Sequence, residues 1–288
     1  MKVYIPEEVG FCFGVKEAIK KVERELKKGG EVFCLGDLVH NPLVMNELCE
    51  KGLKVVSSLS EVKKCGTLIT RAHGVEQSIL EKGKEKGLKI VETTCPYVLR
   101  AHKIIRKLIC ESYHVVIVGS AEHPEIKAIL SDIPFCKVSV INSSERIREV
   151  SEEKKIGIVA QTTESLDNFE NIVKNLIEKR LKSGFEIRVF NTVCSVVIKR
   201  QKEAKELAEK VDAVIVVGGN KSSNTRKLVE ICKKEGKKVY FIEREEELEF
   251  EKIKKLSSVG IIGGTSTPEK IIRNLERKIK KIFSKEGE

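Results

Sequence analysis

The chain has 288 residues, enough for two or three small domains with hydrophobic cores of their own. The formal net charge is +11, but the basic residues alternate with Glu over 16–28 and 199–210, which is typical of solvated helix faces and not of a nucleic-acid surface. The opening residues carry Glu7 and Glu8 without an apolar segment, and no apolar run approaches the ~20 residues that span a bilayer, so we expect a cytoplasmic protein without membrane or nucleic-acid partners.

A strand is predicted over residues 2–5, and after it a first recurring segment begins. Each copy has a β-branched strand, a glycine, a short polar loop and a helix. In each copy a polar residue follows the glycine at the end of the strand by four positions. The three copies run over 32–50, 115–130 and 214–233, and these polar residues are His40, His123 and Ser222.

A second recurring segment follows each copy of the first. It has a strand, a polar loop and a helix, and after the first two helices another strand leads to Cys95 or Cys194. The third copy has no such last strand, so we expect residues 2–5, followed by Cys12, to supply it. The strands of the second segment are predicted over 67–70, 156–159 and 259–262, and the loops after them carry Arg71-Ala72-His73-Gly74, Gln161-Thr162-Thr163 and Gly263-Gly264-Thr265-Ser266.

Continuous β-branched strands separated by helices predict parallel sheets that are covered on both faces. The predicted fold class is therefore α/β, with three lobes related by a pseudo-threefold axis. Each lobe would be a small, mostly parallel sheet flanked by helices, around a central cluster site. The expected lobes are residues 13–95, 96–192 and 193–288, the last completed by the N-terminal strand region 1–12. Ligands of such sheets bind beyond the carboxyl ends of the strands.

Three of the nine cysteines, Cys12, Cys95 and Cys194, occupy equivalent places in this repeat. No CxxC pair is present, so only the fold could bring them together. Three thiolates without a fourth suit an iron–sulfur cluster with one open iron, whereas structural zinc normally takes four ligands; three unrelated structural cysteines remain an alternative. Five others lie in apolar patterns and are predicted to be small buried hydrophobic residues: Cys34, Cys49, Cys110, Cys136 and Cys232.

Polar residues follow the predicted strands at the starts of helices, where unpaired N–H groups and the helix field favour anions. His40, His73 and His123 could hold a diphosphate there. His102 and His114 lie in helix and strand patterns and are predicted to be structural. The serines and asparagine of Ser222-Ser223-Asn224 and Ser266 could cap helices, donate to phosphate, or do both.

Glu125 follows His123 by two residues, near the start of a predicted helix. It could be a first-turn acid that suits the helix dipole, or a proton donor. Thr162 and Thr163 are expected at the same rim of the second lobe. No GxxxxGK[ST] loop is present, which disfavours nucleotide hydrolysis.

Nine motifs, in order from Cys12 to Pro268, resemble those of the 4-hydroxy-3-methylbut-2-enyl diphosphate reductases of the non-mevalonate isoprenoid pathway. They are VGFCFGVKEA, HNP, RAHG, TTCPYV, HPE, AQTT, NTVC with Arg200-Gln201 after it, SSNT and GTSTP. One departure is Val196-Val197-Ile198, which is apolar where the family usually has small and hydroxyl residues. A secondary hydrogen bond from that segment to a cluster is therefore not expected.

The resemblance implies an iron–sulfur oxidoreductase with the trilobed fold. One 4Fe–4S cluster would be held by Cys12, Cys95 and Cys194, with its fourth iron open to substrate, and it could be isolated as a degraded 3Fe–4S form. Glu125 would deliver protons with help from Thr162. Isopentenyl and dimethylallyl diphosphates would be the products, and reduced ferredoxin or flavodoxin the electron donor. The resemblance also implies a diphosphate site made of His40, His73, His123, Ser222, Ser223, Asn224 and Ser266.

Two other functions are weighed against this one. A different three-lobed cluster enzyme, similar to quinolinate synthase, would also leave one iron open, but the His, Ser and Asn side chains and the ordered motifs favour a diphosphate. A redox-sensing nucleic-acid binder would use the net charge and the cysteines, but no helix-turn-helix signal or aromatic platform is present.

Overall fold

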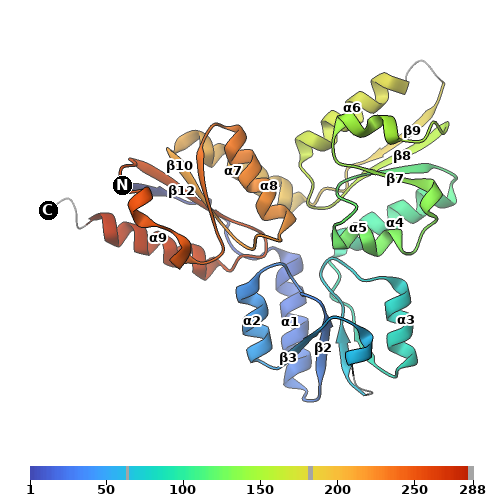
Figure 1. Ribbon diagram of the computed structural model, residues 1–288, viewed down its shortest axis with the longest axis horizontal. Helices are drawn as coiled ribbons and strands as arrows, with labels where there is room; N and C mark the ends of the chain where they lie inside the picture. The colour runs from blue at the N-terminus through green and yellow to red at the C-terminus, as the bar shows by residue number, and fades with distance from the viewer. Residues whose placement is uncertain (63–64, 181–183, 285–288) are drawn as a thin grey trace. The chain divides into compact units, whose positions relative to one another are not determined.

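The structure is a computed structural model that describes residues 1–62, 65–180 and 184–284. Three four-stranded sheets, each entirely parallel, are flanked by helices (Figure 1). The strands β2 (Val32–Leu35), β6 (His114–Val118) and β10 (Ala213–Val217) are central and buried along their whole length. Such burial is what strands covered on both faces require. The prediction of an α/β fold with three such sheets is confirmed.

All three sheets have the same strand order. In each sheet the strand that follows the central strand in the chain lies on one side of it, and the other two strands lie on the other side. The first sheet runs β3 (Leu53–Val56), β2, β4 (Thr67–Ile69), β5 (Lys89–Val91); the second β7 (Val138–Ile141), β6, β8 (Lys155–Ala160), β9 (Glu186–Phe190); the third β11 (Lys238–Ile242), β10, β12 (Ser258–Gly263), β1 (Lys2–Tyr4).

The N-terminal strand completes the third sheet, as the repeat predicts. Lys2 pairs with Ser258, and Tyr4 pairs with Gly260, in a parallel ladder. β1 thus stands where β5 and β9 stand in the other sheets. The strand that comes earliest in the chain is therefore built into the sheet that forms from its last part.

The described residues contain nine α-helices, three of which begin with a proline at the first or second position. Proline suits a helix start because its missing N–H would have no partner there. The helices are α1 (Phe13–Lys27), α2 (Pro42–Glu50), α3 (Gln77–Glu85), α4 (Pro96–Cys110), α5 (Pro124–Leu130), α6 (Leu166–Arg180), α7 (Ser195–Lys210), α8 (Ser223–Lys234) and α9 (Glu269–Ser284).

The chain divides into two compact units. Unit 1 comprises residues 1–19, 39–51 and 195–288, and unit 2 comprises residues 20–38 and 52–194. The third sheet belongs to unit 1, where cores lie on its two sides around Ile261 and Val214. The first and second sheets belong to unit 2. The lobe boundaries at residues 12, 95 and 192 stay a prediction.

The five cysteines predicted to be buried hydrophobic residues do not all follow the prediction. Cys34 and Cys232 are buried, as predicted, but Cys49, Cys110 and Cys136 are exposed. The prediction was wrong for these three because each lies at the end of an apolar segment or just outside it. Cys49 lies on the outer face of α2, Cys110 is the last residue of α4, and Cys136 lies in a short 3-10 turn. All nine cysteines lie within the described residues, and none forms a disulfide.

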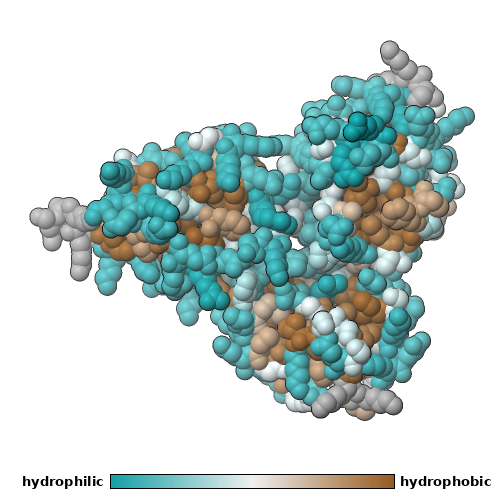
Figure 2. Space-filling view, viewed as in Figure 1, coloured by the Kyte–Doolittle hydropathy of each residue, from teal (hydrophilic) through white to brown (hydrophobic). Residues whose placement is uncertain are grey.

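Hydrophilic residues predominate on the face of the molecule drawn in Figure 2, and hydrophobic residues come to view in patches. Within residues 1–62, 65–180 and 184–284, no helix is both long and apolar enough to cross a membrane.

Candidate functional site

Each of the three repeat cysteines stands directly before a helix and is anchored by the same backbone hydrogen bond. The amide of Cys12 donates to the Thr265 carbonyl at 2.9 Å, that of Cys95 to Ala72 at 3.0 Å, and that of Cys194 to Thr162 at 2.9 Å. The three acceptors occupy equivalent positions in the loops after β12, β4 and β8. Their equivalence confirms the repeat at the level of single hydrogen bonds.

A side-chain bond, which we call the threonine tether, strengthens this anchor in unit 2. The hydroxyl of Thr192, two residues before Cys194, donates to the Ala160 carbonyl at 2.5 Å and accepts from the Ala160 amide at 2.7 Å. Thr93, two residues before Cys95, likewise donates to the Thr70 carbonyl. A buried hydroxyl that is satisfied in this way fixes the segment before the cysteine. The tether gives the pattern Thr-x-Cys a structural reason.

In unit 1, three polar loops approach one another at the carboxyl ends of the third sheet. Gly219 faces the His40 main chain so closely that a Cβ there would lie 2.3 Å from the His40 carbonyl oxygen. Gly264 faces α8, where a Cβ would lie 3.6 Å from Asn224 Nδ2. Both positions require glycine, because a Cβ would meet the His40 main chain at Gly219 and the Thr225 side chain at Gly264. The segments that carry His40, Asn224 and Ser266 are thereby brought together, next to the strand end that anchors Cys12.

Among the described residues of unit 1, the buried side chains of Asn224, Thr225 and Ser266 have polar atoms without a hydrogen-bond partner. Asn224 is 2% exposed, and neither its Oδ1 nor its Nδ2 has a hydrogen bond within the described residues. Ser266 is 6% exposed, and its Oγ also lacks a partner there. An unmade hydrogen bond of this kind costs about 1–3 kcal/mol. Ser222 differs, because its Oγ accepts from the Thr225 amide at 3.3 Å and so caps α8, with the half-buried Ser223 as the next residue.

In unit 2, two predicted histidines meet. The rings of His73 and His123 stand edge to face with centroids 5.6 Å apart. His123 caps α5, with Nδ1 accepting from the Glu125 amide at 3.3 Å. The loop that holds His73 turns at Gly74, whose φ of +89° favours glycine. His73, His123 and Glu125 are therefore neighbours at the edge where β4 and β6 end.

Both carboxyl oxygens of Glu125 accept hydrogen bonds from Thr162, the threonine that was expected at the same rim. The Thr162 amide donates to Oε1 at 2.8 Å, and the Thr162 hydroxyl donates to Oε2 at 2.6 Å. Glu125 is 2% exposed, and this burial raises the pKa of its carboxyl to about 7, although the bonds from Thr162 lower it. A carboxyl with a pKa near neutrality is suited to give and take a proton at physiological pH.

His102 is a neighbour of this group that sequence reasoning set aside as structural. It lies in α4 as predicted, and its Nε2 is 3.1 Å from the Glu125 carbonyl oxygen, to which it donates. Its ring also packs below the His73 loop, where a Cβ on Gly74 would lie 3.6 Å from Cε1. Burial lowers the pKa of His102, which favours the neutral ring. Its only signal in the sequence is its place on the apolar face of α4, two turns after Cys95.

The raised pKa of Glu125 predicts a pH dependence of stability. A carboxyl whose pKa is higher in the folded state stabilises the fold fully below its ordinary pKa of 4.5, and that contribution is lost as the pH rises through about 7. Glu125→Gln should therefore raise the free energy of unfolding above pH 7 by about 3 kcal/mol relative to the parent, and leave it nearly unchanged at pH 4.5. Thermal unfolding of the parent and of Glu125→Gln at pH 5 and pH 8 measures this difference in stability. The control is Glu47→Gln, which changes an exposed carboxyl. Equal unfolding midpoints at pH 8 would contradict the prediction.

The donor chemistry of the repeat cysteines fits a metal–sulfur group. The three side chains are partly buried and outside any disulfide, and Cys12 Sγ accepts from the Val15 amide at 3.5 Å. Cys12 belongs to unit 1, and Cys95 and Cys194 to unit 2. Within the described ranges, no three His, Cys, Asp or Glu side chains are grouped so that they could hold a metal ion.

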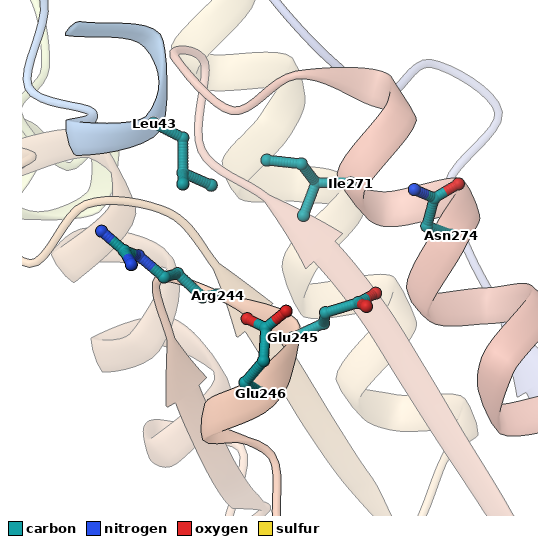
Figure 3. Close-up of a pocket in the computed structure, with 6 residues that line it drawn as sticks. All are labelled: Leu43, Arg244, Glu245, Glu246, Ile271 and Asn274. Carbon is teal, nitrogen blue, oxygen red and sulfur yellow. The ribbon is translucent and has the colours of Figure 1, made fainter. Parts of the chain in front are cut away.

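A pocket of about 310 Å³ lies elsewhere in unit 1, as Figure 3 shows. Leu43 and Ile271 form its apolar side, and Arg244, Glu245 and Glu246 its charged side. None of the predicted site residues lines it.

Comparison with known proteins gives a single family. The LytB protein family matches residues 3–280. The 4-hydroxy-3-methylbut-2-enyl diphosphate reductase of Geotalea uraniireducens is 40% identical over 282 residues, covering 98% of both chains. The enzyme of the same name from Aquifex aeolicus is 40% identical over 284 residues, covering 97% of this chain and 96% of its own.

Solved structures agree with the sequences. The E-1-hydroxy-2-methyl-but-2-enyl-4-diphosphate reductase from Plasmodium falciparum superposes with a TM-score of 0.91 at 27% identity, covering 97% of this chain and 88% of that one. A structure of (E)-4-hydroxy-3-methyl-but-2-enyl diphosphate reductase, described as the terminal enzyme of the non-mevalonate pathway, has a TM-score of 0.69 at 38% identity and covers 98% and 100% of the two chains.

Proposed function

We propose, from the premise that this chain belongs to the LytB protein family, that it is a 4-hydroxy-3-methylbut-2-enyl diphosphate reductase. The reaction removes the allylic hydroxyl of the substrate with two electrons and two protons, and releases water. A C–O bond breaks and a C–H bond forms, giving isopentenyl or dimethylallyl diphosphate. The observation that carries this proposal is the full-length similarity to reductases of that name, joined to a buried carboxyl with a pKa of about 7.

The family implies an iron–sulfur cluster, and we assign its ligands to the repeat cysteines. Cys12, Cys95 and Cys194 would hold a 4Fe–4S cluster whose fourth iron is left for substrate, and loss of that iron would leave a 3Fe–4S form. The equivalent anchoring of the three cysteine amides supports this set. When bound, the cluster would pass on the two electrons of the external donor one at a time, and would offer a Lewis-acidic site for the hydroxyl oxygen.

We assign the diphosphate to the polar residues beyond the strand ends. Asn224 and Ser266 offer buried groups that lack partners within the described residues, and a phosphate oxygen would satisfy them. Both adjoin helix starts, where main-chain N–H groups favour anions. Orientation by such contacts can be worth about 7–11 kcal/mol of the barrier. The assigned set is His40, His73, His123, Ser222, Ser223, Asn224 and Ser266.

Glu125 is assigned as the proton donor. With its pKa at about 7, a large share of the carboxyl is protonated near neutral pH, which a group that protonates a leaving hydroxyl requires. The two bonds from Thr162 hold both carboxyl oxygens in fixed directions. His102 fixes the main chain at the same residue. We further assign ferredoxin or flavodoxin as the electron donor, and the cytoplasm as the location.

An anaerobic assay tests the function. Purified protein is mixed with 4-hydroxy-3-methylbut-2-enyl diphosphate and a reduced viologen dye, and dye oxidation is followed together with the iron and sulfide content. Oxidation that depends on the substrate is the expected result. Protein that holds iron and sulfide but oxidises no dye would refute the reductase, and would favour an enzyme similar to quinolinate synthase.

The unsatisfied amide of Asn224 gives a second prediction. Asn224→Leu keeps the volume but removes two buried polar atoms without partners, so the free energy of unfolding should stay equal or rise by about 1 kcal/mol. The KM for the diphosphate should rise at least tenfold, because the side chain no longer donates. Urea unfolding and steady-state kinetics measure the two effects. A loss of stability without a change in KM would show that Asn224 is a core residue only.

A further inference from the structure

The three repeat cysteines are anchored in two different ways. Cys95 and Cys194 each follow a threonine tether, whereas Gly10 stands two residues before Cys12. A side chain could not replace Gly10, because its φ is +97° and a Cβ would lie 2.9 Å from the Cβ of Glu269 at the start of α9. The third lobe therefore has no room for a tether at this position.

The segment before Cys12 is also the longest of the three. β1 ends at Tyr4, eight residues before Cys12, whereas β9 ends at Phe190, four residues before Cys194. A longer connection has more conformations to lose on folding. The position with the longest segment is thus the one that lacks the threonine.

Arg200 of α7 makes the missing connection. Its Nη1 donates to the Gly263 carbonyl at 2.7 Å, and its Nη2 donates to the Gly10 carbonyl at 3.5 Å. Gly263 ends β12, which is the position that Ala160 holds in β8. In unit 1 the guanidinium therefore connects the segment before Cys12 to the end of β12. In unit 2 the Thr192 tether connects the segment before Cys194 to the end of β8 in the same way. The planar fork of guanidinium donors lets one side chain reach both carbonyls at once.

We propose that Arg200 is the positioning residue of Cys12, replacing the threonine tether of the other two lobes, and that it also places a buried positive charge beside this one cysteine. The second half of the proposal rests on the assignment of Cys12 as a cluster ligand; the first half does not.

The surroundings of Arg200 leave its charge incompletely balanced. The side chain is 5% exposed, and its ion-pair partner Glu203 is 3.5 Å away. Burial raises the pKa of Glu203, which weakens that partner further. The other negative groups that act on the guanidinium are Cys12 and Glu8. The guanidinium contacts the Gly10 carbonyl, two residues before Cys12, and a buried cation placed there would favour the reduced, more negative form of a cluster on that ligand.

Two variants separate position from charge. Arg200→Met removes all donors and the charge, and Arg200→Lys keeps the charge but loses the planar fork. Hydrogen exchange of peptides that cover residues 9–13 in the purified protein reports the Cys12 amide, which donates to Thr265. We expect exchange to be at least tenfold faster in both variants. A spectroscopic redox titration should give a more negative midpoint for Arg200→Met, with Arg200→Lys nearer to the parent.

Arg180→Met is the matched control. Arg180 is a buried arginine that also donates to two carbonyls, those of Ser151 and Val150. It is the last residue of α6 and belongs to unit 2, whereas Cys12 belongs to unit 1. This control should leave both readouts for Cys12 unchanged. Parent-like exchange at residues 9–13 in Arg200→Met would overturn the positioning role, and an unchanged midpoint would overturn the charge role. A parent protein without any cluster would instead refute the proposed function, while the exchange measurement would still decide the tether.

Discussion

Glu125→Gln should lower kcat by about 10²–10⁴-fold while the protein keeps its iron, its sulfide and its visible spectrum. The substitution preserves the shape of the side chain. Its amide oxygen can still accept from the Thr162 amide, and its NH2 group can donate to the Thr162 hydroxyl, but it has no acidic proton to give. Because the acid acts in its protonated form, the kcat of the parent should fall as the pH rises through about 7. Reduced-dye kinetics from pH 5.5 to 9 measures both effects.

Two matched variants make this result specific. Glu164→Gln changes another buried carboxyl, in the loop that carries Thr162, and it should keep kcat within about threefold. Thr162→Val removes a hydroxyl bond that lowers the pKa of Glu125, so the fall in kcat should move to higher pH. Full activity of Glu125→Gln would end the assignment of Glu125 as proton donor.

Replacing any one of Cys12, Cys95 and Cys194 by Ser should abolish turnover and lower the bound iron below that of the parent. A cluster left with two thiolate ligands should be held weakly and lost during purification, because the three cysteine side chains are its proposed bonds to the protein. The measurement is iron and sulfide content, with the electron paramagnetic resonance spectrum of the reduced protein, after anaerobic purification.

The exposed cysteines supply the control for this experiment. Cys110→Ser, at the last position of α4, and Cys136→Ser should retain iron and activity at the level of the parent. Iron retained in all three variants of the repeat cysteines, or lost equally in Cys110→Ser, would contradict the ligand assignment.

The repeat made most of the architecture predictable from the sequence. Central strands such as β6 are uninterrupted β-branched runs, and such runs are buried wherever helices cover both faces. The closure of the third sheet by β1 followed from counting strands per lobe. The edge strands β3, β7 and β11 were not among the predicted elements, because four or five residues such as those of Leu53–Val56 carry too little pattern to separate a strand from a loop.

The site was predictable as a set of residues, but its internal bonds were less so. The pairing of Glu125 with Thr162 was expected because both follow strands of one sheet. The bond of His102 to the Glu125 carbonyl was not, because a histidine on an apolar helix face gives no sign of its partner. The exposure of Cys49 was missed for a related reason: a short helix with mixed polarity has no clear boundary between its buried and exposed faces.

The position of β1 bears on how the chain folds as it is made. Lys2 is synthesised before the strands of the first and second sheets, yet its partner Ser258 is synthesised after them. Domains generally fold as they emerge, so the first and second sheets can form during translation, whereas the third must wait with one strand unpaired. The glycines, serines and cysteine of unit 1 are consequently the last part of the molecule to reach their working arrangement, and contacts of such long sequence separation are slow to form. If Cys12, Cys95 and Cys194 hold the cluster as proposed, we expect its insertion to follow the formation of the third sheet.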